Sequence, residues 1–149
     1  MRFSSRINHF LSFIISLFII YSCSESNNFL ELNIENAYAK KPPEGNNEVA
    51  AYMSLTNATD ESISVNGIFC FGSKASFLHD QRINPDSGMI YMNKINSLII
   101  NPRDTVHFKP GGKHVMIMGV YVDLEIKKVI SCFLSSKKGK KFPVSYVIR

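Results

Sequence analysis

The sequence predicts an all-β protein whose folded part, residues 30–149, is one domain built as a β-sandwich or barrel. Short segments that are apolar, or that alternate between apolar and polar residues, recur along this part of the chain. Turn-forming residues separate these segments. No segment longer than about ten residues has a helical period with caps. These observations favour short, paired strands over helices.

Three strands are expected in the first half of the domain. Residues 30–34 and 62–65 alternate, and residues 49–55 are largely apolar. Residues 73–78 leave room for a single helical turn. Turn chemistry, meaning clusters of Pro, Gly, Asn, Asp and Ser, lies at residues 42–45, 57–60, 85–88 and 101–104.

The last two expected strands form a hairpin with a basic tip. Residues 129–134 and 142–148 are β-like, and four lysines surround a glycine at residues 137–141. A solvated turn accounts for these lysines without any partner, although an acidic protein surface or anionic lipid headgroups could also meet them.

Residues 1–22 have the pattern of a signal peptide. Arg2 and Arg6 precede an apolar run over residues 10–21 that two serines interrupt. A transmembrane helix needs about 20 apolar residues, so a permanent membrane span is the weaker interpretation. Removing the leader takes away two arginines and no acid, which lowers the formal net charge from +5 to +3. This charge is too small to indicate a nucleic-acid binder, and we expect an exported protein.

The leader ends in a pattern that resembles a bacterial lipobox. In Ile20-Tyr21-Ser22-Cys23 the cysteine would become the lipidated first residue, and residues 23–29 would form a tether. Tyr21 departs from the small or aliphatic residue usual at its position. Cleavage after Ser24 is the alternative and would release a soluble protein. We favour lipidation of Cys23, which predicts a protein of the periplasm or cell envelope held to the membrane by lipid.

The other two cysteines, Cys70 and Cys132, lie in apolar, β-like segments. In an oxidising compartment they could form a disulfide or remain two buried thiols, and the sequence leaves both possibilities open. Their apolar surroundings favour the buried thiols, because buried cysteine commonly behaves as a small hydrophobic residue.

Two His/Met pairs indicate a soft-metal site. His114 and Met116 alternate on one expected strand, so their side chains project to the same face, directly after the turn-forming Pro110-Gly111-Gly112. His79 and Met92 flank an upstream turn. Thioether sulfur with imidazole suits Cu(I), whereas Zn(II) prefers thiolate, imidazole or carboxylate. Outside the cytoplasm a thioether has a further advantage over a thiolate, because it cannot form a disulfide.

These residues resemble the periplasmic PCuAC copper chaperone family. Its signature is a His, ten residues, a Met, twenty-one residues, and then His-x-Met. Here Met92 and His114 have twenty-one residues between them, as in the family, but His79 and Met92 have twelve. We expect the two extra residues to lengthen the loop around residues 84–87. The segment 51–57 also follows the family pattern.

The resemblance implies a cupredoxin-like Greek-key β-sandwich that binds one Cu(I) through His79, Met92, His114 and Met116. It also implies transfer of copper to the dinuclear copper centre of cytochrome c oxidase subunit II, alongside a Sco-type thiol-disulfide partner. The chain lacks the His/Met-rich C-terminal tail of some members, so a second copper site is not expected.

Other interpretations of the pattern remain. Met53, Met89 and Met118 are expected to be core residues, and His107 a surface strand residue.

An enzyme is not expected, since the sequence has no nucleophile elbow, HExxH helix or phosphate loop. The alternatives to a chaperone are a lipoprotein that sequesters or stores copper without a dedicated acceptor, and an adhesion or ligand-binding β-sandwich without metal.

Overall fold

The computed structural model describes residues 31–149 of the chain. The predicted signal peptide (1–22), the lipidation site Cys23, the tether (23–29) and residue 30 lie outside the described residues. Within residues 31–149, no helix has both the length and the hydropathy needed to cross a membrane.

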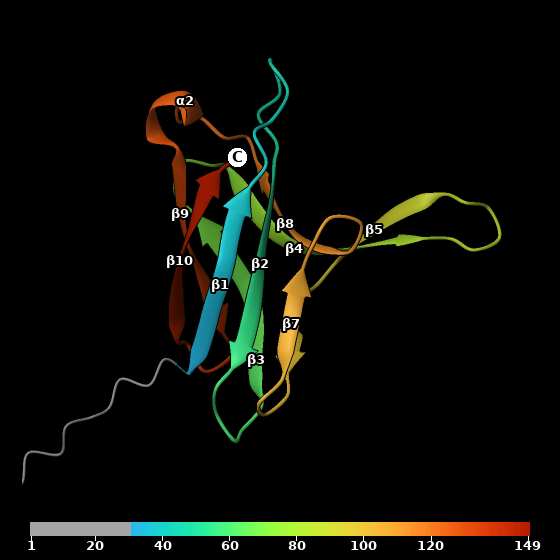
Figure 1. The fold of residues 1–149 in the computed structure, drawn as a ribbon, viewed down its shortest axis with the longest axis vertical. Coiled ribbons are helices and arrows are strands. Elements are labelled where there is room, and N and C mark those ends of the chain that lie inside the picture. The colour runs from blue at the N-terminus through green and yellow to red at the C-terminus, as the bar shows by residue number, and fades with distance from the viewer. Residues whose placement is uncertain (1–30) are drawn as a thin grey trace, which may run out of the picture.

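The described chain is built almost entirely from strands (Figure 1). In chain order they are β1 (Leu32–Ala39), β2 (Val49–Asn57), β3 (Ile63–Cys70), β4 (Ala75–Ile83), β5 (Ile90–Lys94), β6 (Leu98–Ile100), β7 (Thr105–Phe108), β8 (Lys113–Met118), β9 (Val129–Ser136) and β10 (Lys141–Ile148). One short helix, α2 (Leu124–Lys127), precedes β9. The all-β prediction is confirmed.

Hydrogen bonds join the strands in the order β5-β4-β8-β2-β1-β10-β9-β3-β6, and β7 pairs with β2. β1 and β10 are parallel, and the other pairs are antiparallel. The sheet curls back on itself and brings β4 against β3, where the Ser76 hydroxyl donates to the carbonyl oxygen of Ile68 at 2.9 Å. The β4–β5 hairpin projects from this curled body as an arm (Figure 1).

The core fills the inside of the curl. Leu78 of β4 and Val115 and Ile117 of β8 point into it and are at most 1% exposed. Successive side chains of a strand project to opposite faces. His79, His114 and the other odd-numbered β4 and even-numbered β8 residues therefore project to the outer face of the sheet.

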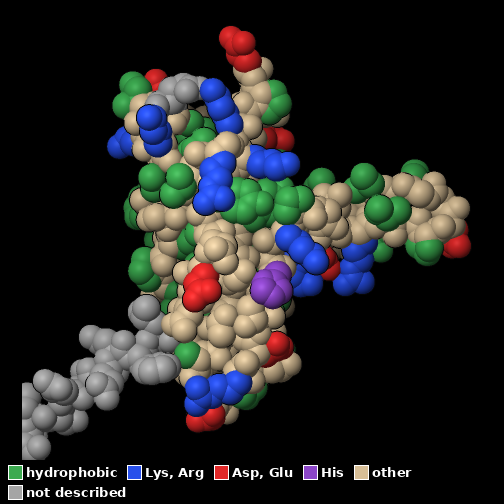
Figure 2. Space-filling model, viewed as in Figure 1, with side chains coloured by type: hydrophobic (Ala, Val, Ile, Leu, Met, Phe, Trp, Pro, Cys, Tyr) green, Lys and Arg blue, Asp and Glu red, His purple; other side chains and the backbone are tan. Residues whose placement is uncertain are grey.

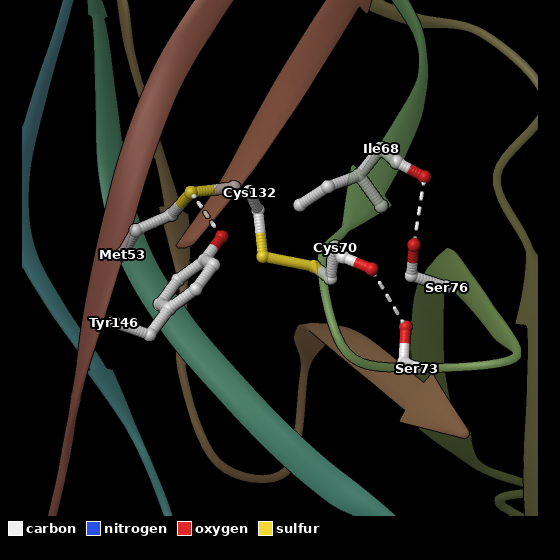
Figure 3. The surroundings of a disulfide bond; sticks show 7 residues. All are labelled: Met53, Ile68, Cys70, Ser73, Ser76, Cys132 and Tyr146. Carbon is white, nitrogen blue, oxygen red and sulfur yellow. Dashed lines mark hydrogen bonds between the residues drawn. A yellow bond between two sulfur atoms is a disulfide. The ribbon is translucent and has the colours of Figure 1, made fainter. Parts of the chain in front are cut away.

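Cys70 and Cys132 form a disulfide, so the expectation of two buried thiols is wrong (Figure 3). The two residues lie directly opposite each other on β3 and β9, with their Cα atoms 4.0 Å apart. Each sequence segment is apolar, as the thiol interpretation required, but the β3–β9 register also places the two side chains against each other. Nearby, the Tyr146 hydroxyl donates a hydrogen bond to the Met53 sulfur at 3.0 Å.

The expected strands and hairpin are present, and they extend further than the sequence patterns. The single helical turn for which residues 73–78 left room is not formed, because Ala75 onward belongs to β4. Pairing with β8 from Ala75 to Asp80 supplies backbone hydrogen-bond partners that a single isolated turn could not.

Asn57 ends β2 and is fully buried. Its amide nitrogen lies within 3.0 Å of the carbonyl oxygens of Glu61, Ile100 and Asn101. Its amide oxygen accepts from the backbone N–H and the hydroxyl of Thr59 at 2.9 and 2.8 Å. The side chain thereby ties the turn after β2 to the end of β6.

Candidate metal centre

The β4–β8 register brings the two predicted histidine ligands together. His79 and His114 are direct cross-strand partners. Their imidazole rings are 5.7 Å apart between centroids and meet edge to face at 87°. These residues are 35 positions apart in the sequence, and antiparallel pairing makes them neighbours on the outer face of the sheet.

His114 is held by its own turn. The segment between β7 and β8 closes with Gly111 at a φ of 76°, a backbone conformation that glycine adopts without strain. Two residues later the Nδ1 atom of His114 lies 3.0 Å from the carbonyl oxygen of Gly112. Because a carbonyl oxygen only accepts, Nδ1 carries the proton and Nε2 is left with its lone pair. His114 is only 5% exposed.

His79 carries a buried polar atom without a partner. Its Nδ1 atom has no hydrogen-bond partner among the described residues. Burial lowers the pKa of His79 below its usual value, and the nearby His114 and Lys94 lower that pKa further. The imidazole is therefore neutral and has a lone pair available at neutral pH. A buried, unpaired polar atom is costly unless something satisfies it, and a metal ion would do so.

Met116 lies beside His114 on β8. It pairs across the sheet with Phe77 of β4 on one side and Ala50 of β2 on the other. Since Phe77 and His79 are two positions apart on β4, the thioether of Met116 is on the same face as both imidazoles. It is partly buried.

Met92 approaches from the arm. It pairs with Gln81, and His79 pairs with Lys94, so Met92 is diagonal to His79 and on the same sheet face. Its side chain is 55% exposed. The predicted loop insertion coincides with the turn of this arm, where the Asn84 side chain accepts from the backbone N–H groups of Asp86 and Ser87. Hydrophobic side chains run along the arm in Figure 2.

The candidate donors are therefore two imidazoles and two thioethers. Within residues 31–149, no group of three or more His, Cys, Asp or Glu side chains is placed to hold a metal ion. A centre made from two histidines thus depends on methionine sulfur for its remaining donors. Neutral nitrogen and soft sulfur donors suit a monovalent soft ion such as Cu(I) better than Zn(II), Mg²⁺ or Ca²⁺.

Three contacting residues were missed by the sequence reasoning. The Phe77 ring stacks beside the His79 ring, 6.0 Å between centroids at 4°, and the Lys94 ammonium lies 4.4 Å from the centre of the Phe77 ring. Gly112 supplies the carbonyl oxygen for His114. Strand alternation could have placed Phe77 two positions before His79 and Lys94 two after Met92.

The other His and Met residues behave differently from the site residues. Met53 is in the core, as predicted. Met89 is not: it lies just before β5 and is 67% exposed, because the arm leaves the body. Met118 is not in the core either, because it projects to the outer face of the sheet with Met116, and it is partly buried there. His107 is exposed on β7, as predicted, with Nδ1 3.0 Å from the Ser54 hydroxyl.

A family model for LpqE-like lipoproteins matches residues 32–148. The chain belongs to the LpqE-like family. The chain has no match among curated proteins. Similar solved structures include the copper-bound PCuAC domain from PmoF2, which has a TM-score of 0.64 and 17% identity, with 80% of this chain and 92% of that chain covered. Apo-DR1885 from Deinococcus radiodurans has a TM-score of 0.61 and 26% identity, with 82% of this chain and 80% of that chain covered.

The Cu(I) form of DR1885 is also similar, with a TM-score of 0.59, 24% identity and 85% of each chain covered. The LpqE-like protein thus has the PCuAC-type fold, and the predicted cupredoxin-like Greek-key β-sandwich is confirmed.

Proposed function

We propose that this LpqE-like protein is an exported copper chaperone that binds one Cu(I) through His79, Met92, His114 and Met116. The observation that carries the proposal is the pairing of His79 with His114 on β4 and β8, with a buried imidazole nitrogen that has no partner among the described residues. Met116 and Met92 flank this pair on the same face.

The similar structures support copper as the cargo. One is a copper-bound PCuAC domain and another is the Cu(I) form of DR1885. All four donors here are neutral, so the bound ion would keep its single positive charge. Such a site is selective for soft metal by donor type and can exchange its ligands, which suits transfer.

Export and a lipid anchor are supported by two separate observations. The family consists of LpqE-like lipoproteins, in agreement with lipidation at Cys23. The Cys70–Cys132 disulfide is of a kind that persists in oxidising compartments outside the cytoplasm. We therefore place the protein in the periplasm or cell envelope.

The acceptor that we propose is the dinuclear copper centre of cytochrome c oxidase subunit II, with a Sco-type thiol-disulfide protein as a second partner. The basis for this acceptor is the resemblance of the His/Met spacing to the PCuAC family. A transfer assay from the Cu(I)-loaded protein to the isolated copper domain of subunit II tests it. Tight copper binding without transfer would favour sequestration or storage.

The site itself is tested by competition for Cu(I) against a chromophoric chelator. We expect one tight equivalent, and a loss of affinity of about 100-fold or more for His114→Ala and for Met116→Leu, since each removes a direct ligand. Met92→Leu should weaken binding as well.

Matched controls separate ligand loss from general damage. Met118→Leu changes the next outward-facing methionine of β8, and Met89→Leu changes the other methionine of the arm. His107→Ala removes a histidine that is not part of the site. All three should bind Cu(I) as the unmodified protein does. Absence of tight binding, or equal binding by the site variants and the controls, would refute the proposal.

A further inference from the structure

A strip of aromatic and basic residues runs from the outer face of β3 and β9 to the β9–β10 turn at one end of the curled sheet. It consists of Phe69, Phe71, Phe133, Lys138, Lys140 and Lys141, and we call it the lysine–phenylalanine strip. The copper chemistry described above uses none of these residues.

The aromatic half of the strip is an exposed cluster of three rings. The Phe69 ring stacks on the Phe133 ring at 5.2 Å and meets the Phe71 ring edge to face at 5.3 Å. Phe69 and Phe71 are 50% and 59% exposed. Their neighbours Ile68, Cys70 and Cys132 point inward, so the rings lie on the outer face of the sheet. A contiguous exposed aromatic patch of this kind marks an interaction surface.

The basic half continues directly from the rings. The Lys141 ammonium lies 4.6 Å from the centre of the Phe133 ring. In the turn before β10, Lys138 pairs with Glu61 at 3.4 Å, and Lys140 pairs with Glu31. Residues 137–141, which form the turn and the start of β10, carry four lysines. Only two acids pair with them, so this end of the strip has an excess of positive charge.

The strip ends where the N-terminal segment enters the domain. Lys140 pairs with Glu31, the first described residue, and Figure 1 shows the β9–β10 turn at the same end of the body as the start of β1. Cys23 precedes Glu31 by eight residues. Even fully extended, eight residues span only about 28 Å. A lipid on Cys23 would therefore keep this end of the domain within that distance of the bilayer surface.

We infer that the lysine–phenylalanine strip docks the domain onto an anionic bilayer; this inference rests on the lipid anchor in the proposed function. The lysines attract anionic headgroups, and the exposed phenylalanine rings enter the interfacial region of the bilayer. Beside the lipid anchor, this basic and aromatic contact would hold the domain against the bilayer surface.

Vesicle sedimentation tests the inference without the lipid anchor. The chain from Ser24 onward is suitable, because residues 31–149 contain the whole curled sheet, its core and its disulfide. We expect it to sediment with phosphatidylcholine vesicles that contain phosphatidylglycerol, and not with pure phosphatidylcholine vesicles. Binding should disappear in about 1 M salt, where the Debye length is about 3 Å.

Two double variants test the two halves of the strip. Lys138→Gln/Lys140→Gln should weaken vesicle binding roughly 10- to 30-fold. Phe69→Ser/Phe71→Ser should weaken it at least about tenfold while leaving the charge unchanged. The matched control Lys40→Gln/Lys109→Gln removes two exposed lysines outside the strip. Its vesicle binding should fall less than that of the strip variants.

Failure to bind anionic vesicles, or equal binding by the strip variants and the control, would overturn the inference and assign the strip to a protein partner instead. Cu(I) titration of the same variants keeps the two proposals separate. Strip variants that keep their copper affinity but no longer bind vesicles would support docking. Absence of copper binding in the unmodified chain would refute only the chaperone proposal.

Discussion

The Nδ1 atom of His114 lies 3.0 Å from the carbonyl oxygen of Gly112, which fixes the imidazole tautomer of a proposed copper ligand. The hydrogen bond holds the proton on Nδ1 and leaves the Nε2 lone pair free to bind a metal ion. Backbone carbonyl groups commonly orient metal-binding histidines in this way.

We expect Nε2 of His114 to be the copper-binding atom. Long-range ¹H–¹⁵N spectra of histidine-labelled protein should show a protonated Nδ1 in the metal-free form at neutral pH, and a shift at Nε2 when Cu(I) is added. His107 provides an internal reference, because it should not respond to copper. A proton that stays on Nε2 in the loaded protein would contradict this assignment.

Removal of the disulfide should destabilise the domain substantially. The cysteines are 62 residues apart, and a loop of that length corresponds to about 4 kcal/mol in the chain-entropy model. We expect Cys70→Ala/Cys132→Ala to lower the free energy of unfolding by about 2–4 kcal/mol in urea titrations. Reduction of the unmodified protein should have a similar effect. If reduction does not move the urea midpoint, the bond is not a stabilising element.

Asn57 should be the most sensitive polar position of the described fold. Asn57→Ala removes a buried side chain that satisfies carbonyl groups of Glu61 and Ile100, so we expect a loss of about 2–4 kcal/mol. The exposed Asn93 on β5 is the matched control, and Asn93→Ala should change the stability by less than about 0.5 kcal/mol. Comparable losses for both variants in urea titrations would show that Asn57 does not have this role.

Tyr146 should make the protein sensitive to alkali. Burial raises the pKa of Tyr146 far above its ordinary value of about 10. In the unfolded chain the phenol loses its proton near pH 10, whereas in the folded chain it keeps the proton. The unfolded state therefore binds fewer protons above pH 10, so stability is complete below that pH and falls as the pH rises, by about 1.4 kcal/mol per pH unit.

Urea titrations at several pH values between about 8 and 11 measure the free energy of unfolding across the range in which an ordinary tyrosine ionises. Tyr146→Phe should flatten the alkaline slope, at the cost of the hydrogen bond to the Met53 sulfur. Equal slopes for the two proteins would mean that Tyr146 ionises normally in the folded state.

Periodicity predicted most of the sheet, because strand alternation is a local property. The hairpin of β9 and β10 and the strands around residues 32 to 65 follow directly from it. The strand from Ala75 to Leu78 does not follow from periodicity, since it depends on pairing with β8, which lies about 40 residues later. The apolar segments around Cys70 and Cys132 favoured buried thiols for the same reason, because only the β3–β9 register brings the two cysteines together.

The sequence pattern predicted which residues the candidate site contains, but not how deeply each of them is buried. Spacing on one strand places His114 and Met116 side by side, and the family resemblance adds His79 and Met92. The sequence gives no sign that His114 is buried while Met92 is largely exposed, since that difference arises because β5 leaves the body with the arm. Lys94 and Phe77 join the site through strand alternation combined with the pairing of β4 with β5 and β8.

In the proposed chaperone, the contrast between Met92 and the other three donors would set the order in which the ligands of copper exchange. His79, His114 and Met116 belong to strands that are hydrogen-bonded on both sides, whereas Met92 lies on the edge strand β5. In the proposed chaperone, a ligand of the acceptor coming from solvent would reach the ion past Met92 and replace its sulfur first. Capture would run in the opposite order, with Met92 as the last donor to bind, so the edge of the sheet would serve as both the entrance and the exit for the ion.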